Sequence, residues 1–242
     1  KNSFKPYVLS AVASVVLLSV GTTSLQAFAE CGATSGPNQT ITCNGSSYTN
    51  GIDYFRQATS PITPGILDLN NSSMVVSTRG IQVGNQRYRS EDVTILADDF
   101  TAINTTIGGI TGRGLMASTA GDATIHVKGG SISTTGGISS GMSAMGILAE
   151  VIGTSPSGKG AAVITLQNTS VTTQGRNALG VVAYNGPLGS SYAKASIDIN
   201  NSIVRTKGND AAALYTSLDT ASNSSESSIA VHGTSIVETY GT

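Results

Sequence analysis

The chain has 242 residues, and its charged fraction of 11% and aromatic fraction of 5%, with no tryptophan, are low for a globular enzyme. With 13 basic and 14 acidic residues the net charge is −1, and no basic run interleaved with aromatic residues occurs, which excludes the electrostatic footprint of a nucleic-acid partner. Glycine and small polar residues dominate instead, so we expect an all-β chain of short strands and tight turns.

Residues 1–29 have the layout of a secretory signal peptide. Two lysines precede an apolar run of 14 residues, Tyr7 to Val20, and the small-x-small motif Ala27-Phe28-Ala29 follows. A transmembrane anchor would need about 20 apolar residues, so a cleaved signal is favoured. A lipoprotein is disfavoured because Glu30 stands where a small residue would precede a lipidated cysteine. We therefore predict cleavage between Ala29 and Glu30, and export of the remaining chain across the inner membrane.

Residues 30–65 do not match the repeats that follow and are predicted to form an N-terminal cap, which would cover the exposed strand edges at this end of the repeats. This segment holds the only two cysteines, Cys31 and Cys43, which an exported chain carries into an oxidising compartment. A disulfide between them would close a loop of about a dozen residues and contribute on the order of 3 kcal/mol by the chain-entropy model. Their spacing, with His126 and His232 far downstream, matches no zinc motif, so no metal site is predicted.

Residues 66–242 are predicted to form stacked repeats. Each block has an alternating strand, an Asn or Gly corner, a second strand that ends at glycine, a third segment of small residues and a variable loop. This order describes one coil of a parallel β-helix, and a single coil cannot bury its apolar side chains without neighbours. Spacings of 39, 33 and 32 residues lie in the range of solenoids and arrays. They are measured between Ile125, Ile164, Ile197 and Ile229.

A β-propeller is the main alternative, because its blades repeat at about 40 residues. Its four longer strands per blade and their aromatic motifs are missing here, so a β-helix of about six coils is favoured. Right-handed winding is expected from the general preference of parallel crossovers. The last block stops inside its motif at Thr242, so we expect the repeats to be truncated at the C-terminus.

Asparagines at the first corner of the blocks are assigned a structural role. Asparagine accepts a left-handed backbone at little cost, and amide side chains of successive coils can stack as hydrogen-bonded ladders. The alternative, glycosylation at Asn-x-Ser/Thr, applies only to a chain made in a eukaryotic secretory pathway. The corner residues are Asn70, Asn71, Asn168, Asn200 and Asn201.

The stretch ECGATSGPNQTITCNGSSYTNGIDY (Glu30 to Tyr54), followed by blocks of the type SxTTxGxxAxGVxA, resembles bacterial autotransporters, the type V secreted proteins, and specifically pertactin-like passengers. The resemblance implies a right-handed parallel β-helix carried to the cell surface through a C-terminal outer-membrane β-barrel, where it acts in adhesion and virulence. The alternating strands and aromatic girdles of such a barrel do not occur in this sequence. A truncated product would therefore stay in the periplasm rather than reach the outer membrane.

No catalytic or cofactor site is predicted, and we do not expect an enzyme. The serine protease passengers carry a GDSGS-like nucleophile, but the motif at Gly121 to Ala123 lacks the serine. Polysaccharide lyases and glycosidases need clustered carboxylates, whereas the neighbours in the pairs Asp98-Asp99 and Glu91-Asp92 point to opposite faces of an extended strand. The glycine clusters match no nucleotide-binding motif.

The sequence therefore predicts an exported surface adhesin or stalk, monomeric, with a host or surface ligand that the residues do not identify. Binding is expected in the variable loops Gly153 to Gly160, Asn185 to Tyr192 and Asp219 to Ser227, because loops tolerate change. One alternative is a carbohydrate-active β-helix enzyme, a polysaccharide lyase or glycosidase, in which three carboxylates would converge on one sheet face. The other is a structural spacer without any ligand.

Overall fold

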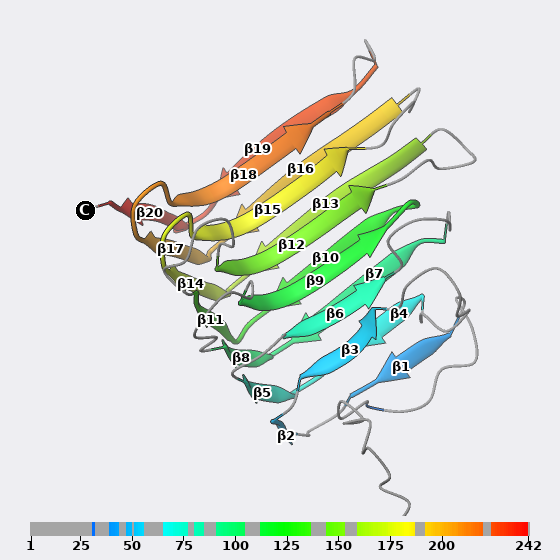
Figure 1. Ribbon diagram of the computed structural model, residues 1–242, viewed down its shortest axis with the longest axis horizontal. Helices are drawn as coiled ribbons and strands as arrows, with labels where there is room; N and C mark the ends of the chain where they lie inside the picture. Colours follow the sequence, from blue (N-terminus) through cyan, green and yellow to red (C-terminus); the bar gives the residue numbers. More distant parts are fainter. Residues whose placement is uncertain are drawn as a thin grey trace, which may run out of the picture.

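Short strands stack in three columns in the computed structural model of the chain, which is an all-β parallel β-solenoid (Figure 1). The predicted signal peptide and its predicted cleavage site before Glu30 lie outside the residues that the structure describes. Those residues are 31, 39–43, 47–49, 51–55, 65–76, 80–84, 91–104, 112–136, 144–152, 159–186, 192–219 and 224–241. Among them, 20 strands form two sheets of seven strands and one of six.

Each coil contributes one strand to each sheet, in the same order, except that the last described coil supplies only β19 and β20. The first sheet contains β1 (Thr40–Thr42), β4 (Ile66–Asp68), β7 (Val93–Asp98), β10 (Ala123–Lys128), β13 (Lys159–Gln167), β16 (Tyr192–Asn200) and β19 (Glu226–His232). The second contains β2 (Ser47–Tyr48), β5 (Ser73–Val76), β8 (Thr101–Asn104), β11 (Ser131–Thr135), β14 (Ser170–Gln174), β17 (Ile203–Lys207) and β20 (Ile236–Tyr240). The third contains β3 (Ile52–Phe55), β6 (Ile81–Gly84), β9 (Arg113–Thr119), β12 (Met145–Ile152), β15 (Leu179–Gly186) and β18 (Ala212–Leu218).

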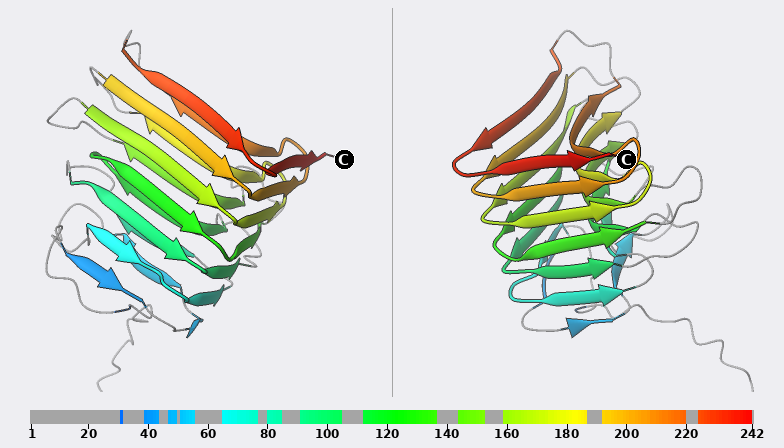
Figure 2. Two further views of the ribbon diagram at one scale, coloured as in Figure 1. Left: turned by 180° about the vertical axis from the view of Figure 1, so that it is seen from behind. Right: turned by 90° about the vertical axis from the view of Figure 1, so that its left-hand side faces the viewer.

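Every strand pairs in parallel with the equivalent strand of the adjacent coils and not with its neighbour in the chain. Figure 2 shows the resulting stack from two further sides. A propeller blade would instead contain sequential strands of one repeat, so the propeller alternative is excluded. The prediction of a parallel β-helix is confirmed.

The core lies inside the column, where equivalent side chains stand above one another. Ile125, Ile164 and Ile197 share one register position, and each is at most 1% exposed. Along each strand buried and exposed residues alternate, as in the buried Val127 and the exposed Lys128, because successive side chains of a strand point to opposite faces. Stacking therefore buries the residues that the sequence pattern assigned to the core.

The third sheet departs from this alternation, because it buries apolar side chains on both faces. Ile147 belongs to the main core, whereas the next residue, Leu148, packs in a separate cluster with Met116 and Val182. These three residues are in register on β9, β12 and β15. Parallel strands that are buried on both faces carry continuous apolar runs. The sequence MGILA has this character.

The predicted cap segment supplies the short strands β1, β2 and β3, which pair with β4, β5 and β6 and so make the first coil. The predicted disulfide between Cys31 and Cys43 is present at its edge. Cys43 is buried, and its backbone amide donates to the carbonyl of Asp68 at 2.7 Å. The disulfide therefore ties the start of the described chain to the first coil.

At the opposite end, β18, β19 and β20 form the outer edges of the three sheets. The apolar residues of β19 and β20 that face the column interior are exposed. Ile229 is 45% exposed, whereas Ile197 in the register position before it is 1% exposed. Val237 is 40% exposed, against 0% for Val204. This end of the column therefore presents unpaired strand edges beside an uncovered section of the core.

The first corner, between the first and second sheets, holds its second residue in the left-handed region. Asn71, Asn168 and Asn201 have φ of 47°, 52° and 48° there. The amide of Asn168 donates to the carbonyl of Asn200 in the next coil at 3.0 Å, so the backbone ladder continues around the corner. Gly129 occupies the equivalent position between Asp99 and Asn168, so the expected stack of amide side chains is interrupted.

The side chains of the corner asparagines bond within one corner or to the backbone of the next coil. Asn71 Nδ2 donates to Asn70 Oδ1 at 2.8 Å, and Asn201 Oδ1 accepts from the amide of Thr234 at 3.0 Å. The carbonyl of Asn200 also accepts the hydroxyl of Ser202 at 2.8 Å. These asparagines therefore act mainly through the backbone conformation that they tolerate.

Candidate functional site

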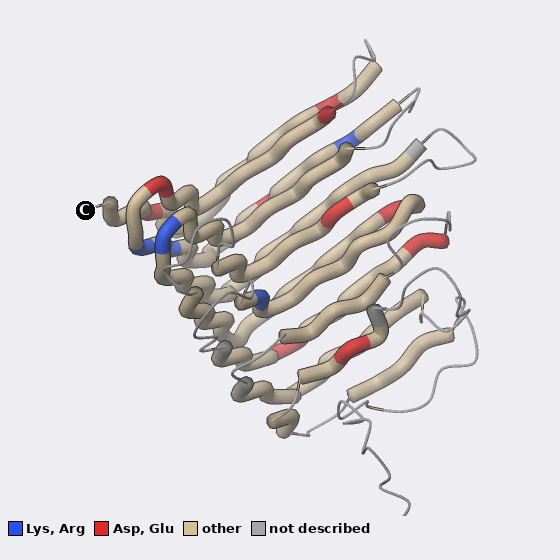
Figure 3. Tube along the Cα trace, viewed as in Figure 1, with Lys and Arg blue, Asp and Glu red and all other residues tan. Residues whose placement is uncertain are grey.

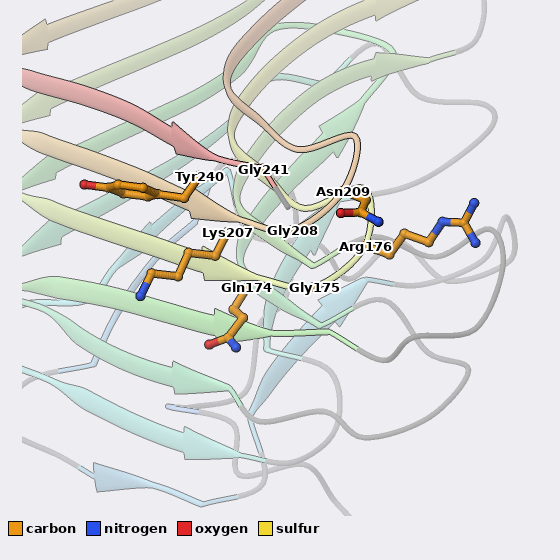
Figure 4. A pocket seen from close by; sticks show the side chains of 8 residues that line it. All are labelled: Gln174, Gly175, Arg176, Lys207, Gly208, Asn209, Tyr240 and Gly241. Carbon is orange, nitrogen blue, oxygen red and sulfur yellow. The ribbon is translucent and has the colours of Figure 1, made fainter.

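A groove of about 560 Å³ lies at the second corner, where the second sheet turns toward the third (Figure 4). It is built by the ends of β14, β17 and β20 and by the turns that follow β14 and β17. Three consecutive coils therefore contribute to one surface. The lining residues are Gln174, Gly175, Arg176, Lys207, Gly208, Asn209, Tyr240 and Gly241.

Stacking register brings the groove residues together, although they are far apart in sequence. Gln174 pairs with Lys207, and Lys207 pairs with Tyr240, at the last position of each strand. All three side chains are exposed and point out of the column. Figure 4 shows them on one side of a row of glycines, Gly175, Gly208 and Gly241, which is called the glycine row below. Arg176 and Asn209 lie on the other side of this row. The groove thus has two polar walls and runs from coil to coil.

The floor of the groove is bare backbone for a steric reason. Gly175 and Gly208 have φ of 142° and 137°, which side-chain-bearing residues rarely adopt. A Cβ atom on Gly208 would lie 1.9 Å from the carbonyl oxygen of Gly175. The amide of Gly175 donates to the carbonyl of Lys207 at 2.9 Å, and that of Gly208 to Tyr240 at 3.0 Å. These glycines are thus explained by the close contact between coils.

An ion pair beside the groove holds Tyr240. Arg205 Nε donates to Glu238 Oε2 at 2.6 Å, and the Tyr240 hydroxyl donates to the same oxygen at 2.6 Å. The hydrogen bond from Arg205, followed by that from Tyr240, lowers the pKa of Glu238. The same contacts raise the pKa of Arg205 and of Tyr240. Glu238 therefore stays ionised and fixes the tyrosine ring at the edge of the groove.

Basic and acidic residues lie together at this corner (Figure 3), and two of the basic residues, Lys207 and Arg176, line the groove. Lys207 Nζ lies 6.0 Å from the centroid of the Tyr240 ring, at the outer limit of a cation–π contact. The carboxylate of Glu238 offsets Arg205, but Lys207 and Arg176 have no carboxylate within ion-pair distance in the described part of the chain. The groove therefore carries a local positive charge on a chain whose net charge is −1.

A second polar cluster lies on the outer face of the third sheet. Ser118, Glu150 and Tyr184 are in register, and the Ser118 hydroxyl donates to Glu150 Oε2 at 2.9 Å. The Tyr184 hydroxyl donates to Asp219 Oδ2 at 2.5 Å. This hydrogen bond, with burial and the charge of Asp219, raises the pKa of Tyr184 to about 12. The described residues hold no group of three acidic, histidine or cysteine side chains arranged to bind a metal ion.

Replacing Tyr184 by phenylalanine is expected to reduce the alkaline sensitivity of folding. Because the folded state raises the pKa of Tyr184 from 10.0 to about 12, its stabilising contribution is complete below pH 10 and is lost as the pH rises toward 12. Denaturant unfolding across this pH range measures the effect. Tyr192→Phe on β16 is the control and should retain the wild-type decline. An unchanged decline in Tyr184→Phe would contradict the assignment.

The structure places the sequence-predicted residues away from the groove. The corner asparagines lie at the first corner, and Cys31 and Cys43 lie at the opposite end of the column. Of the variable loops predicted to bind, 153–158, 187–191 and 220–223 lie outside the described residues. Sequence reasoning missed the groove because it treated Gly175 only as the end of a strand. Aligning QGRN with KGND across successive blocks would have revealed the column of long polar side chains.

No family model matches this chain, and comparison with curated proteins and with solved structures gives no match. The assignment of the fold as a parallel β-solenoid therefore rests on the strand pairing within the chain itself. No helix long and apolar enough to cross a bilayer occurs among the described residues.

Proposed function

We propose that the chain is the N-terminal part of an autotransporter passenger, a right-handed β-helix that is exported to the bacterial surface and serves there as an adhesin or stalk. The observation that carries this proposal is the parallel solenoid, in which equivalent residues stack in register through every sheet. Each added coil lengthens such a column by about 4.8 Å, so the fold is suited to project from a surface.

Two further features support an extracytoplasmic location. The Cys31–Cys43 disulfide suits an oxidising compartment, and the apolar run Tyr7 to Val20 suits a secretory leader. The groove at the second corner supplies a surface on which an adhesin could hold a ligand. A stalk or spacer would leave that surface without a ligand. No observation in the described residues favours the carbohydrate-active enzyme as a second candidate.

Export is tested by producing the full chain in a Gram-negative host and comparing it with Val16→Asp, which places a charge in the apolar run. The wild-type chain is expected in the periplasm or at the surface, beginning at Glu30, with Cys31 and Cys43 protected from alkylation. Val16→Asp should stay in the cytoplasm with its leader uncleaved and both thiols reactive, because a charge in this run opposes insertion.

Val75→Asp is the matched control for export, because Val75 is an exposed residue of β5 that lies outside the leader. It should be processed and oxidised like the wild type. The proposal fails if the wild-type chain remains in the cytoplasm, retains its leader and keeps reduced cysteines. Attachment of cells that display the chain then separates adhesin from stalk, since only an adhesin raises attachment above that of cells without it.

A further inference from the structure

We propose that the groove at the second corner binds an acidic glycan, an oligosaccharide that carries carboxylate or sulfate groups, laid along the axis of the column. This inference rests on the proposed function and deepens it by naming a ligand class. The groove volume of about 560 Å³ lies within the range of about 300–1,000 Å³ that is usual for ligand sites. Its walls come from three consecutive coils, so an extended ligand would contact each coil in turn.

The long side chains of the groove are not required by the fold. Thr135 occupies the register position of Gln174 in the preceding coil, and its short side chain completes the same strand end. From the next coil onward the position carries Gln174, Lys207 and Tyr240 in succession. The glycines of the floor have a steric explanation, whereas the change from threonine to these long polar residues leaves the strand pairing of the coils unchanged. A ligand accounts for it.

The charges of the groove favour an anion. Lys207 and Arg176 lie on opposite sides of the glycine row (Figure 4). Arg205, which lies just outside, is already paired with Glu238. Asp210 follows the groove residue Asn209 but is not part of the lining. A ligand that carries an acidic group on successive units could therefore meet one cation on each wall, and charge-assisted hydrogen bonds to such groups are the stronger ones.

The remaining groups favour a sugar as the carrier of that charge. Tyr240 is held in place by its hydrogen bond to Glu238 and presents a ring to the groove, against which the apolar C–H face of a pyranose can lie. Gln174 offers an amide with both donors and an acceptor, which suits ring hydroxyl groups. A few polar groups beside an aromatic ring are the usual composition of small-ligand sites.

An acidic peptide fits less well, because the backbone of the groove floor is already paired between the coils, and the unpaired edge of β20 lies at the outer end of the groove. Peptides that bind solenoids or sheets by strand addition use unpaired backbone groups. Here the amides of Gly136, Gly175 and Gly208 already donate to the next coil at 2.8, 2.9 and 3.0 Å. Between these coils the floor can therefore contact a ligand sterically but cannot pair with an added strand.

Binding is tested with the purified full chain and fluorescently labelled hexamers, measured by polarisation. The acidic probes are a galacturonate hexamer and a sulfated heparin hexamer, which separate carboxylate from sulfate. The neutral probe is maltohexaose, and the peptide probe is hexaglutamate. At least one acidic hexamer is expected to bind with a Kd below about 1 mM, with an affinity that falls as salt rises, and maltohexaose is expected to bind at least about 10-fold more weakly.

The variants locate the site. Lys207→Gln and Arg176→Gln are each expected to weaken binding about 5-fold, because each removes one exposed charge pair. Tyr240→Leu should weaken it by a similar factor, while Tyr240→Phe keeps the ring and should retain most of the affinity. Lys128→Gln removes the same charge from an exposed position on the first sheet and is expected to have no effect. Circular dichroism confirms that each variant is folded.

The inference is overturned if no acidic hexamer binds, if maltohexaose binds equally well, or if Lys128→Gln weakens binding as much as Lys207→Gln. It is also overturned in favour of a peptide ligand if hexaglutamate binds as tightly and responds to the same variants. Because binding is measured on purified protein, the inference of glycan binding can still be tested if the export experiment fails. Conversely, if no glycan binds the groove, the proposal of an exported stalk is not contradicted.

Discussion

Replacing Gly208 by alanine is expected to destabilise the C-terminal coils by about 3 kcal/mol or more. The new Cβ would lie 1.9 Å from the carbonyl oxygen of Gly175 and 2.6 Å from its carbonyl carbon, so the two coils would have to separate. The φ of 137° adds backbone strain to this overlap. Equilibrium unfolding in guanidinium chloride measures the loss, and amide hydrogen exchange shows whether it is confined to β14, β17 and β20.

Gly241→Ala is the matched control for this prediction. Gly241 belongs to the same groove lining, but a Cβ atom there would meet nothing within 4 Å. Its substitution should change stability by less than about 0.5 kcal/mol, as expected for an open surface site. Equal losses in the two variants would show that the contact between coils at Gly208 is not the cause. A Gly208→Ala variant as stable as the wild type would remove the steric explanation of the groove floor.

The architecture was predictable because its signals are local in sequence. Alternation in Ile164-Thr165-Leu166 predicts a strand, and the block spacing predicts stacking. Both follow from the need to bury side chains that one coil leaves exposed. The strands of the third sheet were harder to predict from the sequence, because their short apolar runs, such as LGVVA, do not alternate with polar residues. Such runs fit a strand buried on both faces, but they also fit a buried helical segment.

The groove could not be found from single blocks, because its contacts join residues one full coil apart. Arg205 and Glu238 are separated by 33 positions and become an ion pair only when β17 and β20 align. A shift of register by one residue would send their side chains to opposite faces. The sequence determines this register through the apolar positions of the core. Surface chemistry is therefore a consequence of the interior packing, and it can be assigned only after the coils are aligned.

Among substitutions in the hydrophobic core, Ile164→Ala on β13 is expected to cause a large loss of stability. The side chain of Ile164 is 0% exposed and lies in register between Ile125 and Ile197, with equivalent core residues above and below. Ile164→Ala is expected to lower the free energy of unfolding by about 3–4 kcal/mol, from lost apolar burial and from the cavity left behind. Guanidinium unfolding, followed by circular dichroism, measures the loss.

Ile229→Ala makes the same chemical change at the end of the same register column. Because Ile229 is 45% exposed, its truncation removes less buried surface and leaves no closed cavity, so the loss should stay below about 1 kcal/mol. The ratio of the two losses measures how far the core is uncovered at the outer edge. If Ile229→Ala costs as much as Ile164→Ala in the purified chain, then another strand covers this edge in solution. The unpaired groups of β19 are the surface to which such a strand would bind.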